Sequence, residues 1–130
     1  MNSWMLLLAT AGMGGLGAGL RYTVDVIVMR GRRGAFPLGI LIVNATGSFA
    51  LGVVTGIAPA IGGGWGTMLG VGLLGGYTTF STVSTETVLL GQSRRRDWAW
   101  TNLVGTLGIC ALGAALGIGI GRVIAGMITG

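Results

Sequence analysis

The chain of 130 residues is 52% hydrophobic and 8% charged, whereas a soluble domain is about one quarter charged; this composition indicates an integral membrane protein rather than a soluble enzyme. The formal charge of +5 comes from eight basic residues, all arginine, which are too few to form a nucleic-acid-binding surface. The absence of histidine and the single cysteine exclude histidine-based catalysis, a zinc site and an internal disulfide.

Four apolar runs are each about 20 residues or longer, the length that crosses a bilayer as a helix. They cover residues about 4–28, 37–57, 65–90 and 98–124, so we expect a single four-helix transmembrane domain spanning residues 1–130. We interpret the first run as a spanning helix and not a cleaved leader, because no positive segment precedes it and it continues past any cleavage point. Pro37 opens the second run, and Pro59 with the following glycines is expected to form a short turn after it.

Glycine makes up 28 residues, and glycines four apart indicate helices that pack closely. This spacing occurs at Gly15/Gly19, Gly52/Gly56, Gly66/Gly70, Gly72/Gly76 and Gly113/Gly117/Gly121. We interpret these glycines as packing positions, because chance alone produces many such pairs in so glycine-rich a chain.

Polar residues lie inside the second and fourth runs, where lipid makes them costly unless they face protein or a water-filled path. Asn44 and Ser48 share one face of the second run. Asn102, Thr106 and Cys110 are also four residues apart, which predicts a polar ladder on one face of the fourth run.

The third run contains its polar residues in one block, residues 75–86. Paired glycines, Gly75 and Gly76, precede six serine and threonine hydroxyls. Glycines followed by β-branched Thr78 and Thr79 are poor helix formers, so we expect the helix to break near its centre and leave backbone carbonyls free. Carbonyl oxygens and hydroxyls suit a small hard cation such as Na⁺. The alternative is that each hydroxyl bonds back to the preceding turn.

The arginines are distributed unequally between the two sides of the predicted membrane domain. The first and third loops contain six of them, Arg30, Arg32, Arg33, Arg94, Arg95 and Arg96, whereas only Arg122 lies near the other side. The positive-inside rule therefore predicts cytoplasmic loops and both termini outside.

The polar residues of the runs offer mostly neutral hydrogen-bond donors. Asn44, Ser81, Ser84 and Thr106 supply amide or hydroxyl groups, Phe80 supplies the positive edge of a ring, and Arg21 stands near the cytoplasmic mouth. Acidic residues number only three, which disfavours a cation pore lined by carboxylates. The pattern favours a path for a small, strongly hydrated anion.

Residues 14–22, 39–52 and 75–86 carry three ordered motifs through which the chain resembles the Fluc/CrcB fluoride channel family. The resemblance implies an antiparallel dimer with fluoride paths along its interface and passive export of cytoplasmic fluoride across the cell membrane, relieving fluoride toxicity. It implies a structural Na⁺ at the dimer centre, held by the backbone carbonyls of Gly75 and Thr78, with no organic cofactor and no enzymatic activity. It implies Asn44 and Phe80 as fluoride-path residues, with Ser81 and Thr82 nearby.

Two features depart from that family. The family usually has a second Phe three residues after the first, where this chain has Val83, and a Tyr and then Ser in its fourth helix, where this chain has Asn102, Thr106 and Cys110. The missing ring and the strong arginine bias lead to the hypothesis that this chain is one half of a heterodimer with a homologous subunit of opposite orientation. A homodimer is the alternative.

Two other functions remain as alternatives. A small multidrug-resistance-like, proton-coupled exporter also has four helices, but that class uses a Glu in its first helix, whereas Glu86 lies in the third run here. A non-conducting structural subunit is the second alternative, because Val83 has no ring to offer.

Overall fold

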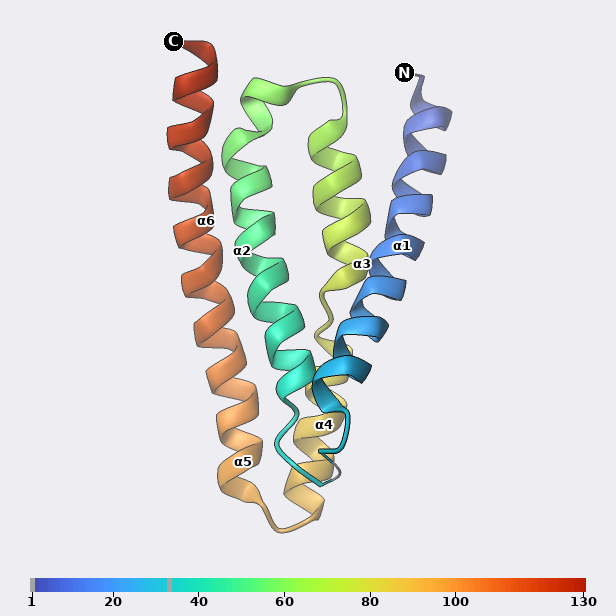
Figure 1. Cartoon of the computed structure of the whole chain (residues 1–130), viewed down its shortest axis with the longest axis vertical. Helices are drawn as coiled ribbons and strands as arrows, with labels where there is room; N and C mark the ends of the chain where they lie inside the picture. The colour runs from blue at the N-terminus through green and yellow to red at the C-terminus, as the bar shows by residue number, and fades with distance from the viewer. Residues whose placement is uncertain (1, 33) are drawn as a thin grey trace.

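The computed structural model describes residues 2–32 and 34–130, so Arg33, one of the six arginines in the orientation argument, lies outside the described residues. The described residues are helical apart from short turns and caps and contain no strand, which confirms the all-α prediction. The elements are α1 (Ser3–Met29), α2 (Leu38–Ile61), the π-helical η1 (Thr67–Leu74), α3 (Gly75–Tyr77), α4 (Ser81–Gln92), α5 (Arg96–Trp100), the π-helical η2 (Thr101–Gly105) and α6 (Thr106–Thr129). They form one elongated bundle with both termini at the same end (Figure 1).

Three continuous helices are long and apolar enough to cross a membrane: Ser3–Met29, Leu38–Ile61 and Arg96–Thr129, the last combining α5, η2 and α6. The third apolar run is not among them, because it is divided between η1, α3 and α4. Thr78 is extended, with φ −78° and ψ 153°, and separates α3 from α4. The paired glycines remain helical, so the break follows them and falls at the two threonines.

Several predicted helix boundaries are wrong. The second helix does not end near residue 57 but continues through Pro59 to Ile61, because a proline in the last turn removes only one backbone donor. Gly62, Gly63 and Gly64 then end it with positive φ angles. The last helix is longer than residues 98–124 at both ends, running from Arg96 to Thr129.

Close backbone packing joins α2 to α6 through glycines. A Cβ on Gly117 would collide with the Phe49 carbonyl and lie 2.9 Å from the Val53 nitrogen, and a Cβ on Gly52 would collide with the Ala114 carbonyl. No larger residue can occupy these positions while the helices keep this separation. We call this contact the glycine seam, formed by Gly52, Gly56, Gly117 and Gly121.

A second close contact joins α1 to η1 and α3. A Cβ on Gly17 would collide with the Leu73 carbonyl, and one on Gly76 would collide with the Gly14 carbonyl. The predicted packing pair Gly15/Gly19 makes no close contact within this chain, because nothing in its described part lies within 4 Å of a Cβ at either position. The pair lies on the opposite side of α1 from Gly17, which makes the contact.

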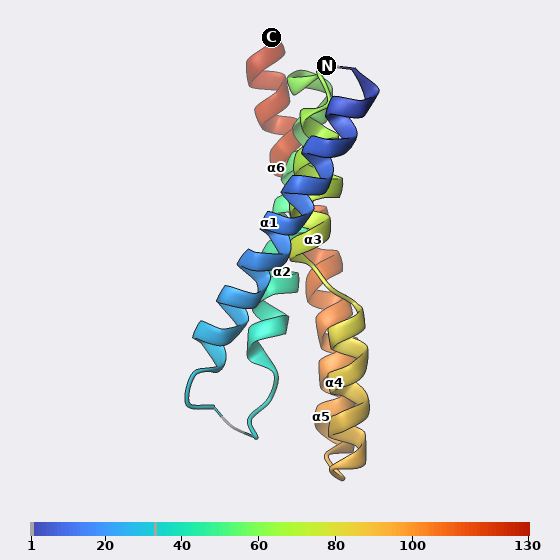
Figure 2. The same ribbon diagram turned by 90° about the vertical axis from the view of Figure 1, so that its right-hand side faces the viewer.

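At the end away from the termini, the α1–α2 loop and the α4–α5 pair diverge (Figure 2). Arg95 links them, since its Nη1 donates to the Gly34 carbonyl at 2.7 Å. The Arg95 guanidinium also lies 4.5 Å from the centre of the Trp98 ring, a cation–π contact. The two arginine-containing turns are therefore connected directly.

Candidate functional site

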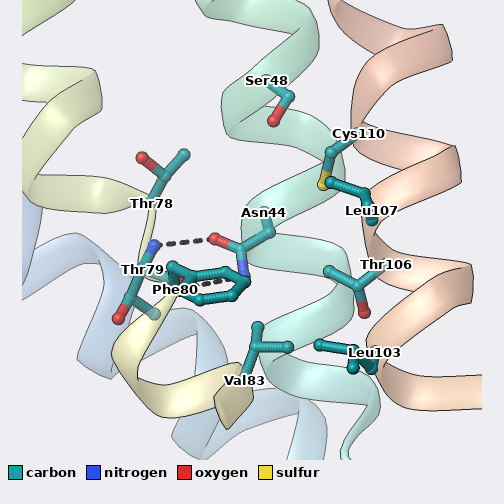
Figure 3. Close-up of a pocket in the computed structure, with 10 residues that line it drawn as sticks. All are labelled: Asn44, Ser48, Thr78, Thr79, Phe80, Val83, Leu103, Thr106, Leu107 and Cys110. Atoms are coloured by element: carbon teal, nitrogen blue, oxygen red, sulfur yellow. Dashed lines mark hydrogen bonds between the residues drawn. The ribbon is translucent and has the colours of Figure 1, made fainter. Parts of the chain in front are cut away.

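A cavity of about 220 Å³ lies beside the break in the third run. Its lining comes from α2, the break, α4, η2 and α6, and Figure 3 shows these side chains surrounding it. The lining residues are Asn44, Ser48, Thr78, Thr79, Phe80, Val83, Leu103, Thr106, Leu107 and Cys110. None of them is acidic or basic, so the cavity offers only neutral groups.

Asn44 holds the break through both ends of its amide. Its Oδ1 accepts the Thr79 backbone N–H at 2.7 Å, and its Nδ2 donates to the Thr79 carbonyl at 2.8 Å. Both bonds are drawn in Figure 3. Asn44 is only 5% exposed, and it satisfies two backbone groups that the unwound turn would otherwise leave unpaired. One Nδ2 hydrogen remains beyond these two bonds.

The Thr79 hydroxyl is the centre of a second set of bonds. It accepts the Thr82 backbone N–H at 3.3 Å and lies 3.1 Å from Ser81 Oγ and 3.2 Å from Thr82 Oγ1. Such a hydroxyl caps the first turn of α4 as an N-cap side chain does. Ser81 and Thr82 therefore belong to this cluster, and neither lines the cavity.

These bonds divert two N–H groups from helical partners. In a continuous α-helix, Thr79 N–H would donate to the Gly75 carbonyl and Thr82 N–H to the Thr78 carbonyl. Here they donate to Asn44 Oδ1 and Thr79 Oγ1. The carbonyls of Gly75 and Thr78 thus lack their helical donors, and free carbonyl oxygens of this kind fit a hard cation.

The two ends that meet at the break differ in charge. The helix formed by η1 and α3 ends there with its carbonyls, which carry partial negative charge, whereas α4 begins there with its N–H groups, which carry partial positive charge. One break thus provides, at the same depth, an end suited to a cation and an end suited to an anion.

Phe80 and Val83 face different environments. Phe80 is 68% exposed although it also lines the cavity, whereas Val83 is 2% exposed. The Phe80 ring therefore belongs both to the cavity and to the outer face of this chain. Val83 is part of the small buried core and presents no ring.

Thr106 and Asn102 carry buried polar atoms without partners in the described part of the chain, namely Thr106 Oγ1 and Asn102 Oδ1. Thr106 lines the cavity. Asn102 instead faces α4, where its Nδ2 donates to Thr87 Oγ1 at 2.9 Å and to the Val83 carbonyl at 3.3 Å. The predicted one-face ladder of the fourth run is wrong for Asn102, because Asn102 lies within the π-helical turn η2, where the residue spacing differs from that of the α-helix containing Thr106.

Two other predicted site residues lie away from the cavity. The Ser84 hydroxyl donates back to the Phe80 carbonyl at 3.1 Å, and its side chain borders a separate surface hollow beside Gln92. Arg21 belongs to α1 and lines neither of these spaces. Ser48 and Cys110 do line the cavity and were absent from the predicted site, although their spacing of four from Asn44 and Thr106 was the available signal.

A larger cavity, of about 410 Å³, lies near the α1–α2 loop. Glu86 and Arg95 both line it, but Arg95 binds the Gly34 carbonyl. Glu86 Oε2 is buried and has no hydrogen-bond partner among the residues that the structure describes. This carboxylate is separate from the neutral cavity at the break.

Comparison with known proteins gives a consistent result. The family described as CrcB-like protein, Camphor Resistance (CrcB), matches residues 8–118. A protein of Leifsonia xyli subsp. xyli named "Fluoride-specific ion channel FluC 1" is 45% identical over 122 residues, covering 90% of this chain and 87% of its own. "Fluoride-specific ion channel FluC" of Shewanella amazonensis is 41% identical, covering 85% and 91%, and that of Ruminiclostridium cellulolyticum is 35% identical, covering 95% and 98%.

Proposed function

The chain belongs to the CrcB-like protein family, and from that premise we propose that it forms a fluoride-selective ion channel through which cytoplasmic fluoride leaves the cell passively. The chain is a multi-pass membrane protein, and the relatives it matches are named as ion channels and not as enzymes. The observation that carries the proposal is the neutral cavity at the helix break, which brings Asn44, Phe80 and Thr106 together.

The chemistry of this cavity suits fluoride. A small anion gives up its hydration shell only if other donors replace the water. The unpartnered Thr106 hydroxyl and the remaining Nδ2 hydrogen of Asn44 are such donors, and the Phe80 ring offers a positive edge. The amino end of α4 adds a favourable potential for an anion.

We assign four crossings to one domain, residues 1–130. Three are α1, α2 and the continuous helix α5–η2–α6, and the fourth is the broken pair formed by η1–α3 and α4. The position of both termini at one end supports an even number of crossings (Figure 1). The arginine distribution supports placing that end outside and the Arg95-containing turn in the cytoplasm of the cell membrane.

A structural Na⁺ is the expected second ion. The carbonyls of Gly75 and Thr78 would hold it, since the N–H groups that would bond them in a helix donate elsewhere. Bound there, the ion would supply a positive charge, and it would hold the carbonyl of Gly75 close to that of Thr78 at the break. No acidic side chain lines the break, so carbonyl oxygens are its main ligands.

An antiparallel dimer would place two such breaks together. The 68% exposed Phe80 supports a partner on this face, because a ring used in a path must meet further protein and not lipid. Buried Val83 and the arginine bias favour a homologous subunit that supplies the missing ring and inserts in the opposite orientation. A homodimer is the competing assembly.

Two other functions compete. A proton-coupled exporter of the small multidrug-resistance kind is disfavoured because α1 contains no Glu and the matched relatives are named for fluoride. A non-conducting subunit, whose partner alone carries the path, is favoured by one observation, the buried Val83 in place of a ring.

Fluoride efflux from liposomes tests these proposals. The chain is reconstituted alone and with a homologous subunit that has the reversed arginine bias and both Phe residues. We expect fluoride flux, without chloride flux, from the pair and little from the chain alone. Full flux from the chain alone would reject the obligate partner, and fluoride retained in both preparations would reject the channel.

Substitution separates a conducting from a structural subunit. Phe80→Leu in this chain is expected to lower flux by about tenfold or more, because it removes the ring edge that the anion would meet in the cavity. A rise of about 1.4 kcal/mol in the barrier gives that factor. Trp100→Leu is the matched control, since Trp100 is an aromatic residue of similar exposure, 67%, outside the cavity. Equal flux from both variants would favour the structural subunit.

A further inference from the structure

We propose that Asn44 and Thr79 are positioning residues that keep the carbonyls of Gly75 and Thr78 available to the cation, so that one set of hydrogen bonds couples the cation site to the anion cavity. This inference rests on the proposed function. It differs from an assignment of Asn44 as a fluoride ligand alone, because its action reaches the cation through the backbone of the break.

Asn44 keeps the Gly75 carbonyl free by accepting the Thr79 N–H that would otherwise bond to it. Both Asn44 contacts to the third run are to one residue, Thr79, whose N–H and carbonyl it engages at 2.7 and 2.8 Å. Without the amide, these backbone groups would lose their partners at membrane depth, where an unpaired group costs several kcal/mol. The nearest alternative acceptor along the chain for Thr79 N–H is the Gly75 carbonyl, and that bond would rebuild the helical turn.

The Thr79 hydroxyl keeps the Thr78 carbonyl free in the same way. Its hydroxyl accepts the Thr82 N–H at 3.3 Å, which in a continuous helix would donate to Thr78. The same hydroxyl is within 3.2 Å of Thr82 Oγ1, so it is held in place by the side chain of the residue whose N–H it accepts. Removal of this hydroxyl leaves Thr82 N–H free to turn to the Thr78 carbonyl.

Asn44 thus acts where α3 ends, and the Thr79 hydroxyl acts where α4 begins. Both effects pass through Thr79, whose backbone Asn44 binds. Asn44 lines the anion cavity with its side chain while it fixes the turn that carries the cation ligands. Thr79 lines the same cavity from the broken segment. A change in either residue should therefore alter the affinity for the cation even when no fluoride is present.

The test is the Na⁺ concentration needed to raise the melting temperature of the purified, assembled protein by a fixed increment in fluoride-free solution, with choline replacing Na⁺ at constant chloride. Wild type is compared with Asn44→Ala, Thr79→Val and Thr79→Ser. We expect this concentration to rise by about tenfold or more in Asn44→Ala and Thr79→Val, because backbone N–H groups would then occupy the carbonyls that bind the cation. The concentration needed rises in proportion to the dissociation constant of Na⁺. Thr79→Ser keeps the hydroxyl and should remain close to wild type.

The pair Thr79→Val and Thr79→Ser carries the test if Asn44→Ala does not fold, since valine keeps the shape of threonine and the Asn44 bonds are to backbone atoms. If the Na⁺ concentration needed for that increment is unchanged in either Asn44→Ala or Thr79→Val, the inference is overturned, whatever happens to flux. Wild type that conducts fluoride but gains no stability from Na⁺ also overturns it and leaves the proposed channel intact. Stabilisation by Na⁺ that shifts as expected, in a protein that conducts no fluoride, supports the inference and rejects the channel.

Discussion

Helix α2 takes part in two contacts that are built in opposite ways. In its second half, the glycine seam brings Gly52 and Gly56 against Gly117 and Gly121 of α6, backbone against backbone. In its first half, the polar side chain of Asn44 forms hydrogen bonds to the backbone of Thr79 in the unwound segment between α3 and α4. The seam is specified by the absence of side chains and the break by one side chain with the right donors and acceptors.

The difference shows how a membrane protein can place a polar site without a large core. Lipid gives no hydrophobic drive for helices to associate, so close approach through small residues supplies van der Waals contact. The seam fixes α2 relative to α6, and Asn44 and Thr106 then approach the same cavity from these two helices (Figure 3).

Gly117→Leu tests the seam and should have the largest effect. A Cβ there would collide with the Phe49 carbonyl, which belongs to helix backbone and cannot move alone. We expect a loss of about 3 kcal/mol or more, or no folded protein, since overpacking already costs 1–3 kcal/mol where side chains can adjust. Thermal unfolding in detergent measures this, with Gly119→Leu as control because a Cβ there meets nothing within 4 Å. Equal loss in both variants would contradict the seam.

Asn102→Leu tests whether α4, the second part of the broken run, is also held by a buried amide. The substitution removes the bonds to Thr87 Oγ1 and the Val83 carbonyl. We expect destabilisation by about 1–3 kcal/mol, the usual effect of leaving a buried partner unpaired. Thr101→Val, next to it but exposed and bonded only within its own helix, should change much less. A neutral Asn102→Leu would show that this half of the run is held by packing alone.

Gly15→Ala tests the correction to the predicted packing glycines. Nothing lies within 4 Å of a Cβ at Gly15, so the new methyl meets no neighbour in this chain and removes backbone freedom. We expect stabilisation by about 0.5–1 kcal/mol. Gly17→Ala, two residues along the same helix, should instead be destabilising because a Cβ there meets the Leu73 carbonyl. Reversed signs, measured by thermal unfolding, would restore the predicted pair.

Thr106→Val separates stability from conduction. The Thr106 hydroxyl is buried without a partner among the described residues, so an apolar group of the same shape should not destabilise the protein. Fluoride flux should fall by about tenfold, because Thr106 lines the cavity and its hydroxyl has no partner among the described residues. Thr106→Ser should retain most of the flux. Full flux from the valine variant would remove Thr106 from the path.

The sequence was most informative where the signal was local. The block of glycine and threonine at 75–79 predicted a helix break, and the cavity contains the predicted residues Asn44, Phe80 and Thr106. The position of the break within that block could not be predicted, because it depends on Asn44, 35 residues away in the chain.

Other errors came from assuming a constant helical period. The glycine spacing was correct in the seam but selected the wrong side of α1, where Gly17 makes the contact. The spacing of Asn102, Thr106 and Cys110 predicts one face, but Asn102 lies in the π-helical turn η2 and does not line the cavity, whereas the other two do. Ser81, interpreted as a neutral donor, and Thr82, suggested by the family resemblance, bond to Thr79 in this structure, and their part in the path stays a prediction.

The π-helical turn η2 has a consequence for how the last helix can change. Such a turn accommodates one more residue than an α-helical turn, so a single-residue deletion within Thr101–Gly105 could be absorbed without interrupting the helix. Because a π-helical turn and an α-helical turn cover about the same rotation, such a deletion would leave α5 and α6 facing much as they do now. The surplus residue instead decides which side chains share a face: it lets Asn102 contact α4 while Thr106 and Cys110 border the cavity at the break.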